Sequence, residues 1–275
     1  MVMMRPRFHS ASLLAALLVL AGIEVKGEGR TTFAIGPAYF EGKDDYGETD
    51  PALGVANNDW SGADDGDGYA LTFRHDQRRW FVQATVESLT IRHRGDSLFI
   101  VCFGGGVPQP PFATCERWPS AFDFDDDYEG AELTVGGRLP ISEVWSAWGQ
   151  AGVSYQRWSS SGGTVQLFPP TGVVSALDPV RRSESTWTAG AGFARRSQRL
   201  DLELGVRYQP EGYFPSTGVQ VRTGNPIPYE TTGSSSLLEG IARADWYFTP
   251  RWFGRLEYRP SRQRQYLHAG LGIAF

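Results

Sequence analysis

The sequence has few of the residues that build metal or redox centres, and its main part lacks long apolar runs. It contains two cysteines, Cys102 and Cys115, and four histidines in 275 residues. No histidine or further cysteine lies near that pair at the spacing of a zinc site. After residue 27 no apolar stretch approaches the roughly 20 residues of a membrane-spanning helix, and the mean hydropathy is -0.32. These absences exclude a bundle of membrane helices, and we expect neither a metal nor a cofactor.

Basic patches are missing as well. The formal net charge is -5, and no basic stripe interleaved with aromatic residues occurs, so we expect no nucleic-acid partner. Glycine and aromatic residues are abundant instead, with Gly 33, Trp 9, Tyr 11 and Phe 16. A membrane β-barrel needs small residues for its lumen and rings for the two membrane interfaces. A soluble β-sandwich has a similar composition, so composition alone leaves two all-β architectures open.

The N-terminal segment predicts export. Arg5 and Arg7 precede an unbroken apolar run, LLAALLVLAGI, which is too short to span a bilayer. A basic start, a short apolar core and small residues are typical of a secretory signal peptide. We therefore interpret residues 1–27 as a signal peptide and 28–275 as the mature domain, with an uncleaved anchor as the alternative. Because disulfides form in exported proteins, a disulfide between Cys102 and Cys115 is favoured over a metal pair.

The mature chain alternates apolar and polar residues with period two, the signature of strands with two different faces. In the last ten residues, Leu267, Ala269, Leu271, Ile273 and Phe275 fall on one face, and polar or small residues fall on the other. The pattern predicts ten strands, within a range of eight to twelve. The ten segments are 31–40, 68–75, 79–88, 130–138, 145–156, 186–194, 199–208, 237–248, 252–259 and 266–275.

The connections between these segments alternate in length. The short ones are 75–79, 139–143, 195–198 and 249–251, and the long ones are 42–67, 93–129, 159–185 and 209–236; the last outer connection, 260–265, is short. Short turns on one side and long loops on the other are the layout of an up-and-down transmembrane barrel, with the turns in the periplasm. We therefore expect an all-β, antiparallel outer-membrane barrel that presents four long acidic loops outside.

The signal-like start and the terminal strand YLHAGLGIAF resemble those of the small outer-membrane β-barrel superfamily, the OmpA/OmpX-like group. The resemblance covers the whole mature chain in pattern. It implies an integral location in the bacterial outer membrane, with membrane lipids and lipopolysaccharide as neighbours. The last strand, with Leu271, Ile273 and Phe275, resembles the family's signal to the barrel assembly machinery. The group shares an architecture across many functions, so it implies no ligand.

Charged residues on the inner faces of the predicted strands point to a polar lumen. The cations are Arg74, Arg138, Arg207, Arg243 and Arg255, and the anions are Glu87, Glu132, Asp201, Glu203, Glu239, Asp245 and Glu257. Charges inside a narrow barrel need partners, and arginine pairs with carboxylates through two bonds. Because about eight strands already leave a lumen filled by side chains, we expect a closed or very narrow pore crossed by an ionic network.

The histidines offer little support for catalysis. We expect His75 to lie in a solvated turn and His268 to face the lumen, and His93 lies near Ser97 and Asp96 in a predicted loop. Omptin-like barrel proteases place an Asp–His pair at the outer rim, and no such pair is recognised in the outer loops here. Barrel lipid A deacylases carry a histidine and a serine two apart on a late strand, where this chain has His268 and Gly270.

Acidic residues gather in the first two outer loops, and aromatic residues lie near strand ends. The acids are Asp44, Asp45, Glu48, Asp50, Asp64, Asp65, Asp67, Asp123, Asp125, Asp126, Asp127 and Glu129. The predicted interface aromatics are Trp80, Trp145, Trp158, Trp187, Trp246, Tyr247, Trp252 and Tyr258. The sequence predicts a structural or surface-interaction barrel. A narrow channel and a rim-located hydrolase are the alternatives.

Overall fold

The computed structural model describes residues 29–50, 55–103, 114–167, 174–177, 181–210, 214–222, 225–233, 236–262 and 264–275. Within these ranges, side chains are not described at 43–50, 55–62, 97–103, 114–120, 160–167, 174–177, 181–182, 214–222, 225–233 and 236, nor at 122, 124 and 184. The predicted signal peptide lies outside the described residues. In the described part of the chain, no helix is long and apolar enough to span a membrane.

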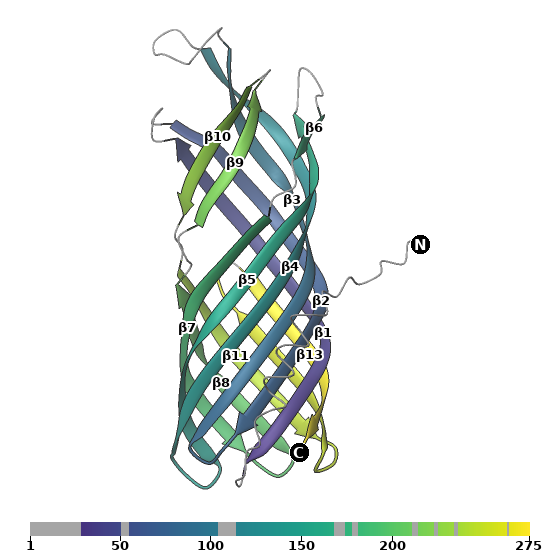
Figure 1. The fold of residues 1–275 in the computed structure, drawn as a ribbon, viewed down its shortest axis with the longest axis vertical. Helices are drawn as coiled ribbons and strands as arrows, with labels where there is room; N and C mark the ends of the chain where they lie inside the picture. The colour runs from purple at the N-terminus through teal and green to yellow at the C-terminus, as the bar shows by residue number, and fades with distance from the viewer. Residues whose placement is uncertain are drawn as a thin grey trace, which may run out of the picture.

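The chain closes into an antiparallel barrel of ten strands (Figure 1). Its strands are β1 (Arg30–Asp50), β2 (Val55–Asp76), β3 (Trp80–Phe103), β4 (Thr114–Pro140), β5 (Trp145–Leu167), β7 (Arg181–Arg196), β8 (Leu200–Pro210), β11 (Ser236–Tyr247), β12 (Trp252–Pro260) and β13 (Arg264–Ala274). Neighbours in the ring follow chain order, and the pairing of β1 with β13 closes it. The predicted all-β barrel and its strand number are confirmed.

Three further strands lie outside the ring. The short β6 (Val174–Leu177) pairs with the outer end of β5, and β9 (Phe214–Arg222) and β10 (Asn225–Gly233) form a separate hairpin. Both chain ends of the barrel and its four short turns lie at the lower end in Figure 1, at residues 77–79, 141–144, 197–199 and 248–251. This end is called the short-turn rim below.

The bounds of all four predicted long loops are wrong, because paired strands occupy most of the residues in each of them. The pairing of β1 with β2 continues to Asp50 opposite Val55, and that of β3 with β4 continues to Phe103 opposite Thr114. Asp64 and the acidic run ending at Asp127 therefore lie on strands. Backbone pairing closes the hydrogen bonds of a ladder whatever its side chains, so a strand can continue after its apolar alternation has ended.

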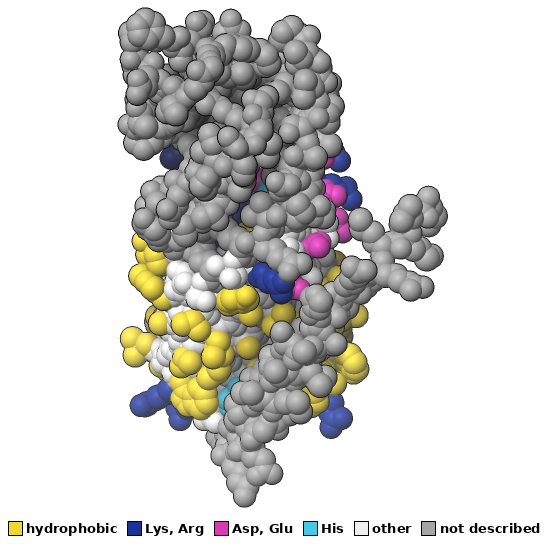
Figure 2. Space-filling view, turned by 45° about the horizontal axis from the view of Figure 1, so that its top comes forward, with side chains coloured by type: hydrophobic (Ala, Val, Ile, Leu, Met, Phe, Trp, Pro, Cys, Tyr) yellow, Lys and Arg dark blue, Asp and Glu magenta, His cyan; other side chains and the backbone are white. Residues whose placement is uncertain are grey.

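The outer surface of the barrel carries an exposed apolar belt (Figure 2). Its side chains include Ile35, Leu133, Val135, Val153, Phe193, Leu204, Val206, Leu256 and Leu271, which are 47% to 63% exposed. Aromatic side chains border it, with Trp80, Trp145, Trp246 and Trp252 beside the short turns and Tyr39, Tyr69, Tyr155, Trp187 and Tyr208 at the other edge. Of the predicted interface aromatics, Trp158 and Tyr247 instead pack inward.

Inside the barrel, large rings lie over glycines on neighbouring strands. A Cβ atom on Gly136 would lie 2.2 Å from the ring of Phe81, and one on Gly272 would lie 2.2 Å from the ring of Phe253. Phe81 and Phe253 are almost completely buried. The lumen therefore packs densely at these places only because the opposing residue has no side chain.

Candidate functional site: the barrel lumen

The lumen is arranged in layers, which can be followed along the inner face of β3. From the short-turn rim outward, that face presents Phe81, then Gln83 and Thr85, then Glu87, then Leu89 and Ile91, and finally His93. These residues alternate with outward-facing ones, as the pleat of a strand requires. An aromatic layer, an ionic layer, an apolar layer and a second charged layer thus follow one another toward the outside.

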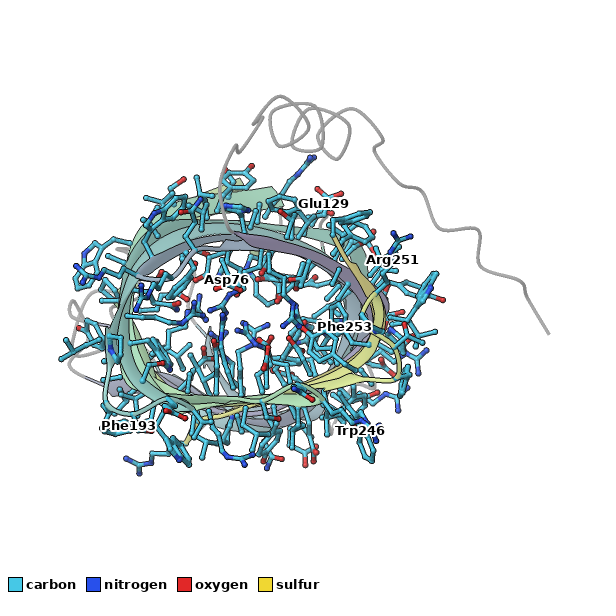
Figure 3. All side chains as sticks on the ribbon, turned by 90° about the horizontal axis from the view of Figure 1, so that it is seen from below. Asp76, Glu129, Phe193, Trp246, Arg251 and Phe253 are labelled. Carbon is cyan, nitrogen blue, oxygen red and sulfur yellow. The ribbon has the colours of Figure 1, made fainter. Side chains whose placement is uncertain are left out.

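Glu203 on β8 is the centre of the lower part of the ionic layer. Arg74 on β2 donates to both carboxylate oxygens of Glu203, from Nη1 to Oε2 at 3.0 Å and from Nη2 to Oε1 at 2.8 Å. Arg138 on β4 donates to Oε1 at 3.2 Å, and Arg243 on β11 donates to Oε2. One carboxylate therefore ties β8 to its neighbour β11 and, across the lumen, to β2 and β4. Figure 3 shows side chains from around the ring pointing into the lumen.

Asp76 at the end of β2 is a second centre, just below Glu203. Its Oδ1 accepts hydrogen bonds from Nε of Arg74 at 3.0 Å and from Nη1 of Arg138 at 2.6 Å. Arg196 on β7 adds an ion pair at 3.0 Å. The guanidinium groups of Arg74 and Arg138 also lie 4.2 Å and 4.8 Å from the ring centroid of Phe81, where cation–π attraction adds to the ion pairs.

Arg207 on β8 organises the upper part of the ionic layer. Its Nη1 donates to Glu239 at 2.7 Å and its Nη2 donates to Glu132 at 2.7 Å. Arg264 adds a hydrogen bond to Glu239 at 3.2 Å, and Thr188 donates to Glu132 at 3.2 Å. Glu132 thus joins β4 to β7 and β8 through side chains alone.

The remaining lumen charges also lie in pairs. Asp245 accepts from Nε and Nη2 of Arg255 at 2.7 Å each, and Arg259 pairs with Glu87 and Glu257. Every lumen charge that the alternation predicted therefore has a partner, with Asp201 paired to Arg30 at 3.3 Å. All these residues together are called the lumen network below.

Several members of the network were not recognised from the sequence: Arg30, Asp76, Arg196, Arg259 and Arg264. Each lies at the end of a strand. Asp76, Arg196 and Arg259 continue the inward phase of Arg74, Ala194 and Glu257 by one further step of two residues. Extending each alternation by one step would have found these three residues.

Little free space remains between the charged side chains. One cavity of about 40 Å³ is lined by aromatic residues, including Tyr128, Trp158 and Tyr266, and by arginines and carboxylates of the upper network. A second cavity of about 30 Å³ lies beside Trp148 and Glu203. Because one water molecule needs roughly 10–15 Å³ on this measure, each cavity holds only a few waters.

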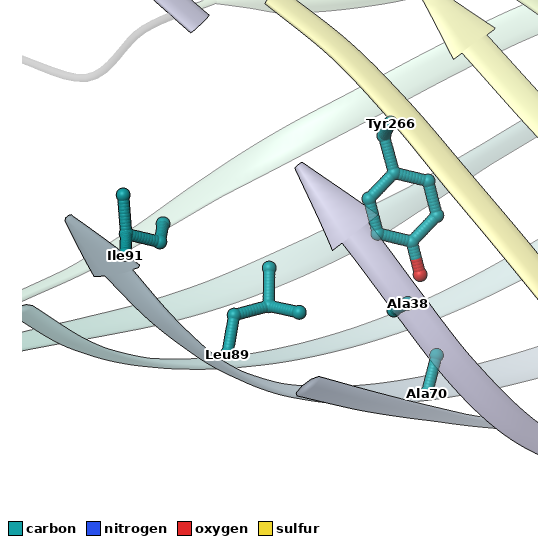
Figure 4. Close-up of a cluster of buried hydrophobic side chains, with 5 residues drawn as sticks. All are labelled: Ala38, Ala70, Leu89, Ile91 and Tyr266. Carbon is teal, nitrogen blue, oxygen red and sulfur yellow. The ribbon is translucent and has the colours of Figure 1, made fainter. Parts of the chain in front are cut away.

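An apolar layer follows on the outer side of the network. Ala38, Ala70, Leu89, Ile91 and Tyr266 form a buried cluster contributed by β1, β2, β3 and β13 (Figure 4). Three partly buried rings pack against it, and the rings of Tyr128 and Trp158 lie 4.7 Å apart. This layer separates the network from the outermost charged layer.

The outermost layer contains an Asp–His–Asp arrangement across three adjacent strands. Nδ1 of His93 on β3 lies 2.8 Å from Oδ1 of Asp64 on β2, and its Nε2 lies 3.3 Å from Oδ2 of Asp126 on β4. The site lies beyond the apolar belt, because Arg92 and Arg94 on either side of His93 face outward and are exposed. The expectation that the outer part has no Asp–His pair is therefore wrong.

The electrostatics of this arrangement oppose a role in base catalysis. Burial lowers the pKa of His93, but hydrogen bonds to Asp126 and Asp64 and their negative charges outweigh burial and raise it to about 9. The imidazolium is then the stable form at neutral pH, and each ring nitrogen faces a carboxylate. A general base needs a free nitrogen lone pair and a pKa near the working pH, so His93 has the properties of a cation that ties three strands together.

The other two histidines that the structure describes, His75 and His268, are held in place by packing. His75 lies on β2 and is 7% exposed, with Nδ1 2.9 Å from Oγ1 of Thr31 and its ring 5.6 Å from that of Trp80. Its predicted place in a solvated turn is therefore wrong. His268 faces the lumen and is 1% exposed. Among the residues that the structure describes, no group of three potential ligands is arranged to hold a metal ion.

Two further predictions concern particular places on the strands. The backbone register sets Cys102 directly opposite Cys115 in the β3–β4 ladder, a separation that suits a disulfide, although their side chains lie outside the description. Leu271 on β13 and Phe275 directly after β13 are 63% and 76% exposed, and Ile273 lies on the same face of the strand as Leu271. Neither placement tests the bond or the assembly role.

No family model and no curated protein sequence matches the chain. Several solved structures of outer-membrane proteins show a distant similarity to it. The attachment invasion locus protein Ail of Yersinia pestis has a TM-score of 0.35 and 14% identity, over 90% of this chain and 100% of that one. The outer membrane protease OmpT of Escherichia coli has a TM-score of 0.48 and 11% identity, over 90% and 96%. The outer membrane protein OprG of Pseudomonas aeruginosa has a TM-score of 0.36 and 12% identity, over 90% and 96%. These TM-scores are all below 0.5, so the similarities carry no argument about this chain, and its barrel architecture rests on the strand pairing described above.

Proposed function

We propose that this chain is an integral outer-membrane β-barrel protein with a sealed lumen, which acts as a structural or surface-interaction protein and not as a channel or hydrolase. The proposal rests on the distribution of apolar and charged side chains, which is the reverse of that in a soluble protein. The apolar side chains of this chain form the exposed belt, and its charged side chains are buried in the lumen network. A soluble protein does not expose so large a contiguous apolar surface, whereas a barrel in lipid requires it.

The aromatic borders of the belt support insertion in a membrane. Tryptophan and tyrosine prefer the boundary between hydrocarbon and water, where the ring is apolar and one end is polar. Four tryptophans occupy the edge beside the short turns, and mainly tyrosines occupy the other edge. The belt and its two borders thus supply the three zones of a bilayer.

The filling of the lumen supports a closed state. Open diffusion porins use about sixteen to eighteen strands, and ten strands leave a narrow interior. Here the two cavities of about 40 Å³ and 30 Å³ share the side chains of Glu132, Arg207 and Arg259 in their linings. An ion crossing this layer would have to displace pairs such as Arg74–Glu203 or Arg207–Glu132.

One side of the wall continues above the membrane, which supports a role at the surface. Pairing between β13 and β1 ends at Gly42, whereas β1 and β2 remain paired to Asp50. β3 and β4 extend further still. We assign surface contacts to this tall side of the wall, a disulfide to Cys102 and Cys115 within it, and recognition by the assembly machinery to the last strand. Lipopolysaccharide is the proposed neighbour of the upper aromatic border.

Planar-bilayer recording tests the closed lumen. We expect the purified protein to insert and to give no steady open level at moderate voltage. A triple Arg74→Ala, Arg138→Ala, Arg243→Ala variant removes three arginines that converge on Glu203 and serves as the matched opened form. Large, steady conductance from the unaltered protein would contradict the proposal.

A further inference from the structure

The short-turn rim is basic, although the chain as a whole is acidic. Arg78 and Arg79 in the turn after β2, Arg199 before β8 and Arg251 before β12 are all exposed. Of the acidic residues at this rim, Glu143 is exposed in a turn, and Asp76 and Asp201 are paired with Arg196 and Arg30 of the lumen network. Figure 2 shows blue side chains at the lower edge of the molecule, directly beneath the yellow belt.

These four arginines differ from those of the lumen in their partners. Each lumen arginine pairs with at least one carboxylate, as Arg196 does with Asp76 at 3.0 Å. Among the described side chains, Arg78, Arg79, Arg199 and Arg251 have no ion pair. Their positive charge is therefore available to an external anion.

The depth of the rim arginines points to the kind of anion. Arg79 immediately precedes Trp80, and Arg251 immediately precedes Trp252. Both tryptophans face outward, 40% and 53% exposed, at the edge of the belt. The guanidinium groups therefore lie at the level of lipid headgroups, because indole rings mark that level in a membrane.

The turn between β4 and β5 supports the same interface by different chemistry. It has no arginine, and it exposes Leu139, Ile141 and Val144 at 70%, 60% and 41%. Such side chains are unfavourable in water but suit the boundary of a bilayer. Binding of a soluble polyanion does not account for the exposed apolar side chains of this turn. A lipid leaflet accommodates both the basic turns and the apolar turn.

We propose that Arg78, Arg79, Arg199 and Arg251 bind the phosphodiester headgroups of anionic phospholipids in the leaflet on the short-turn side. Guanidinium matches phosphate oxygens through two parallel hydrogen bonds, and the two lysines of the chain, Lys26 and Lys43, lie far from these turns in the sequence. The inference rests on the proposed insertion in a membrane. It goes beyond that proposal by assigning a lipid class to one rim.

Quenching of tryptophan fluorescence by brominated lipids tests the inference. The purified protein is placed in vesicles of phosphatidylcholine and phosphatidylglycerol in which only one of the two lipids carries brominated chains. The ratio of the two quenching curves gives the relative association constant. We expect phosphatidylglycerol to be preferred, with a loss of roughly fivefold per arginine at most, and the preference to weaken in concentrated salt.

Variants at the two edges of the belt show which arginines cause the preference for phosphatidylglycerol. The rim variant is Arg78→Gln, Arg79→Gln, Arg199→Gln, Arg251→Gln, and the control is Arg92→Gln, Arg94→Gln on the outer side, where Arg94 forms an exposed pair with Asp123. Loss of the preference in the rim variant and its retention in the control would support the proposal. An unchanged preference in the rim variant, or no preference in the unaltered protein, would overturn it.

Two further outcomes separate the possible causes. Competition by soluble glycerophosphate or peptidoglycan fragments that exceeds the effect of sodium chloride at the same ionic strength would overturn the choice of a lipid, since screening alone affects both salts equally. Quenching by neither brominated lipid would instead contradict insertion itself, and the proposed function would fail together with the inference.

Discussion

Glu203 illustrates how a single buried carboxylate can hold a barrel together. Three arginines from β2, β4 and β11 converge on it, and its side chain is 11% exposed. Glu203 contributes to stability mainly because it neutralises buried arginines that would otherwise be unpaired. Desolvation offsets most of the attraction within a buried pair, but removing one partner leaves the other charge buried and unpaired.

Glu203→Gln should therefore lower the free energy of unfolding by about 3–5 kcal/mol. Urea unfolding in detergent or lipid, followed by the heat-modifiable shift of the folded barrel on a gel, measures the change. Glu143→Gln in an exposed turn is the control and should change little. Adding Arg243→Met to Glu203→Gln should restore part of the loss, because the ion pair of Arg243 is with Glu203 and the double variant removes the cation left unpaired. Equal stability of Glu203→Gln and the unaltered protein would contradict this role.

The adjacent glycines Gly136 and Gly137 provide a matched test of packing in the lumen. A Cβ on Gly136 would approach the ring of Phe81 to 2.2 Å, whereas one on Gly137 would meet no atom closer than 3.8 Å. We expect Gly136→Ala to lower the free energy of unfolding by about 1–3 kcal/mol through overpacking, and Gly137→Ala to be nearly neutral. The same unfolding assay applies. If both substitutions had the same effect, backbone entropy and not the ring would be responsible.

At the scale of elements, the cluster of Asp64, His93 and Asp126 joins the outer parts of β2, β3 and β4. The pKa of His93 is raised from 6.5 to about 9 in the folded state. A raised pKa means that the folded state binds the proton more tightly, so its contribution is complete below pH 6.5 and is lost as the pH rises through 9. The shift corresponds to about 3 kcal/mol.

The stability difference between the unaltered protein and His93→Gln should therefore be constant below pH 6.5 and shrink between pH 6.5 and pH 9. Urea unfolding at a series of pH values measures this difference, and a nuclear magnetic resonance titration of the imidazole gives the pKa directly. A titration midpoint near 6.5 would show that the carboxylates do not hold the proton.

The elements that could be predicted from the sequence are those that cross the belt. In β8, Leu204 and Val206 alternate with Glu203, Gly205 and Arg207, because one face meets lipid and the other meets the lumen. Farther out on β3 the outward residues become Ser88, Arg92 and Arg94, so the apolar half of the alternation disappears although the pairing continues. Strand extent was underestimated for this physical reason.

The candidate site in the lumen could likewise be predicted only in part. The phase of alternation suffices to place Arg74 and Arg138 in the lumen, since it decides which face a residue occupies. It does not say which strands meet across the ring. The contacts of Asp64 with His93 and of Arg207 with Glu132 depend on register and on side-chain reach, and neither is written in local periodicity. Local alternation also does not show where a strand ends. Asp76 falls in the predicted turn 75–79, although it is the last residue of β2.

For the whole molecule, the decisive property is which surface faces hydrocarbon. Leu204 is 57% exposed within the belt, and Ser88 lies near its outer edge, opposite Tyr69. An arginine on the lipid face costs about 2–4 kcal/mol at the bilayer midplane and roughly 0–1 kcal/mol near an interface. The two positions therefore differ in their distance from water in a membrane and would be equivalent in a soluble protein.

We expect Leu204→Arg to reduce the yield of folded, heat-modifiable barrel in lipid vesicles strongly, and Ser88→Arg to reduce it little. The difference in yield between the two variants should be smaller when folding is measured in detergent micelles, because micelles adapt to a charge more easily than a bilayer does. Indifference to both substitutions in vesicles would mean that the belt does not face lipid. Because both side chains point away from the lumen network, on the outer face of their strands, a defect specific to Leu204→Arg reports on the membrane face and separates the location of the barrel from the sealing of its interior.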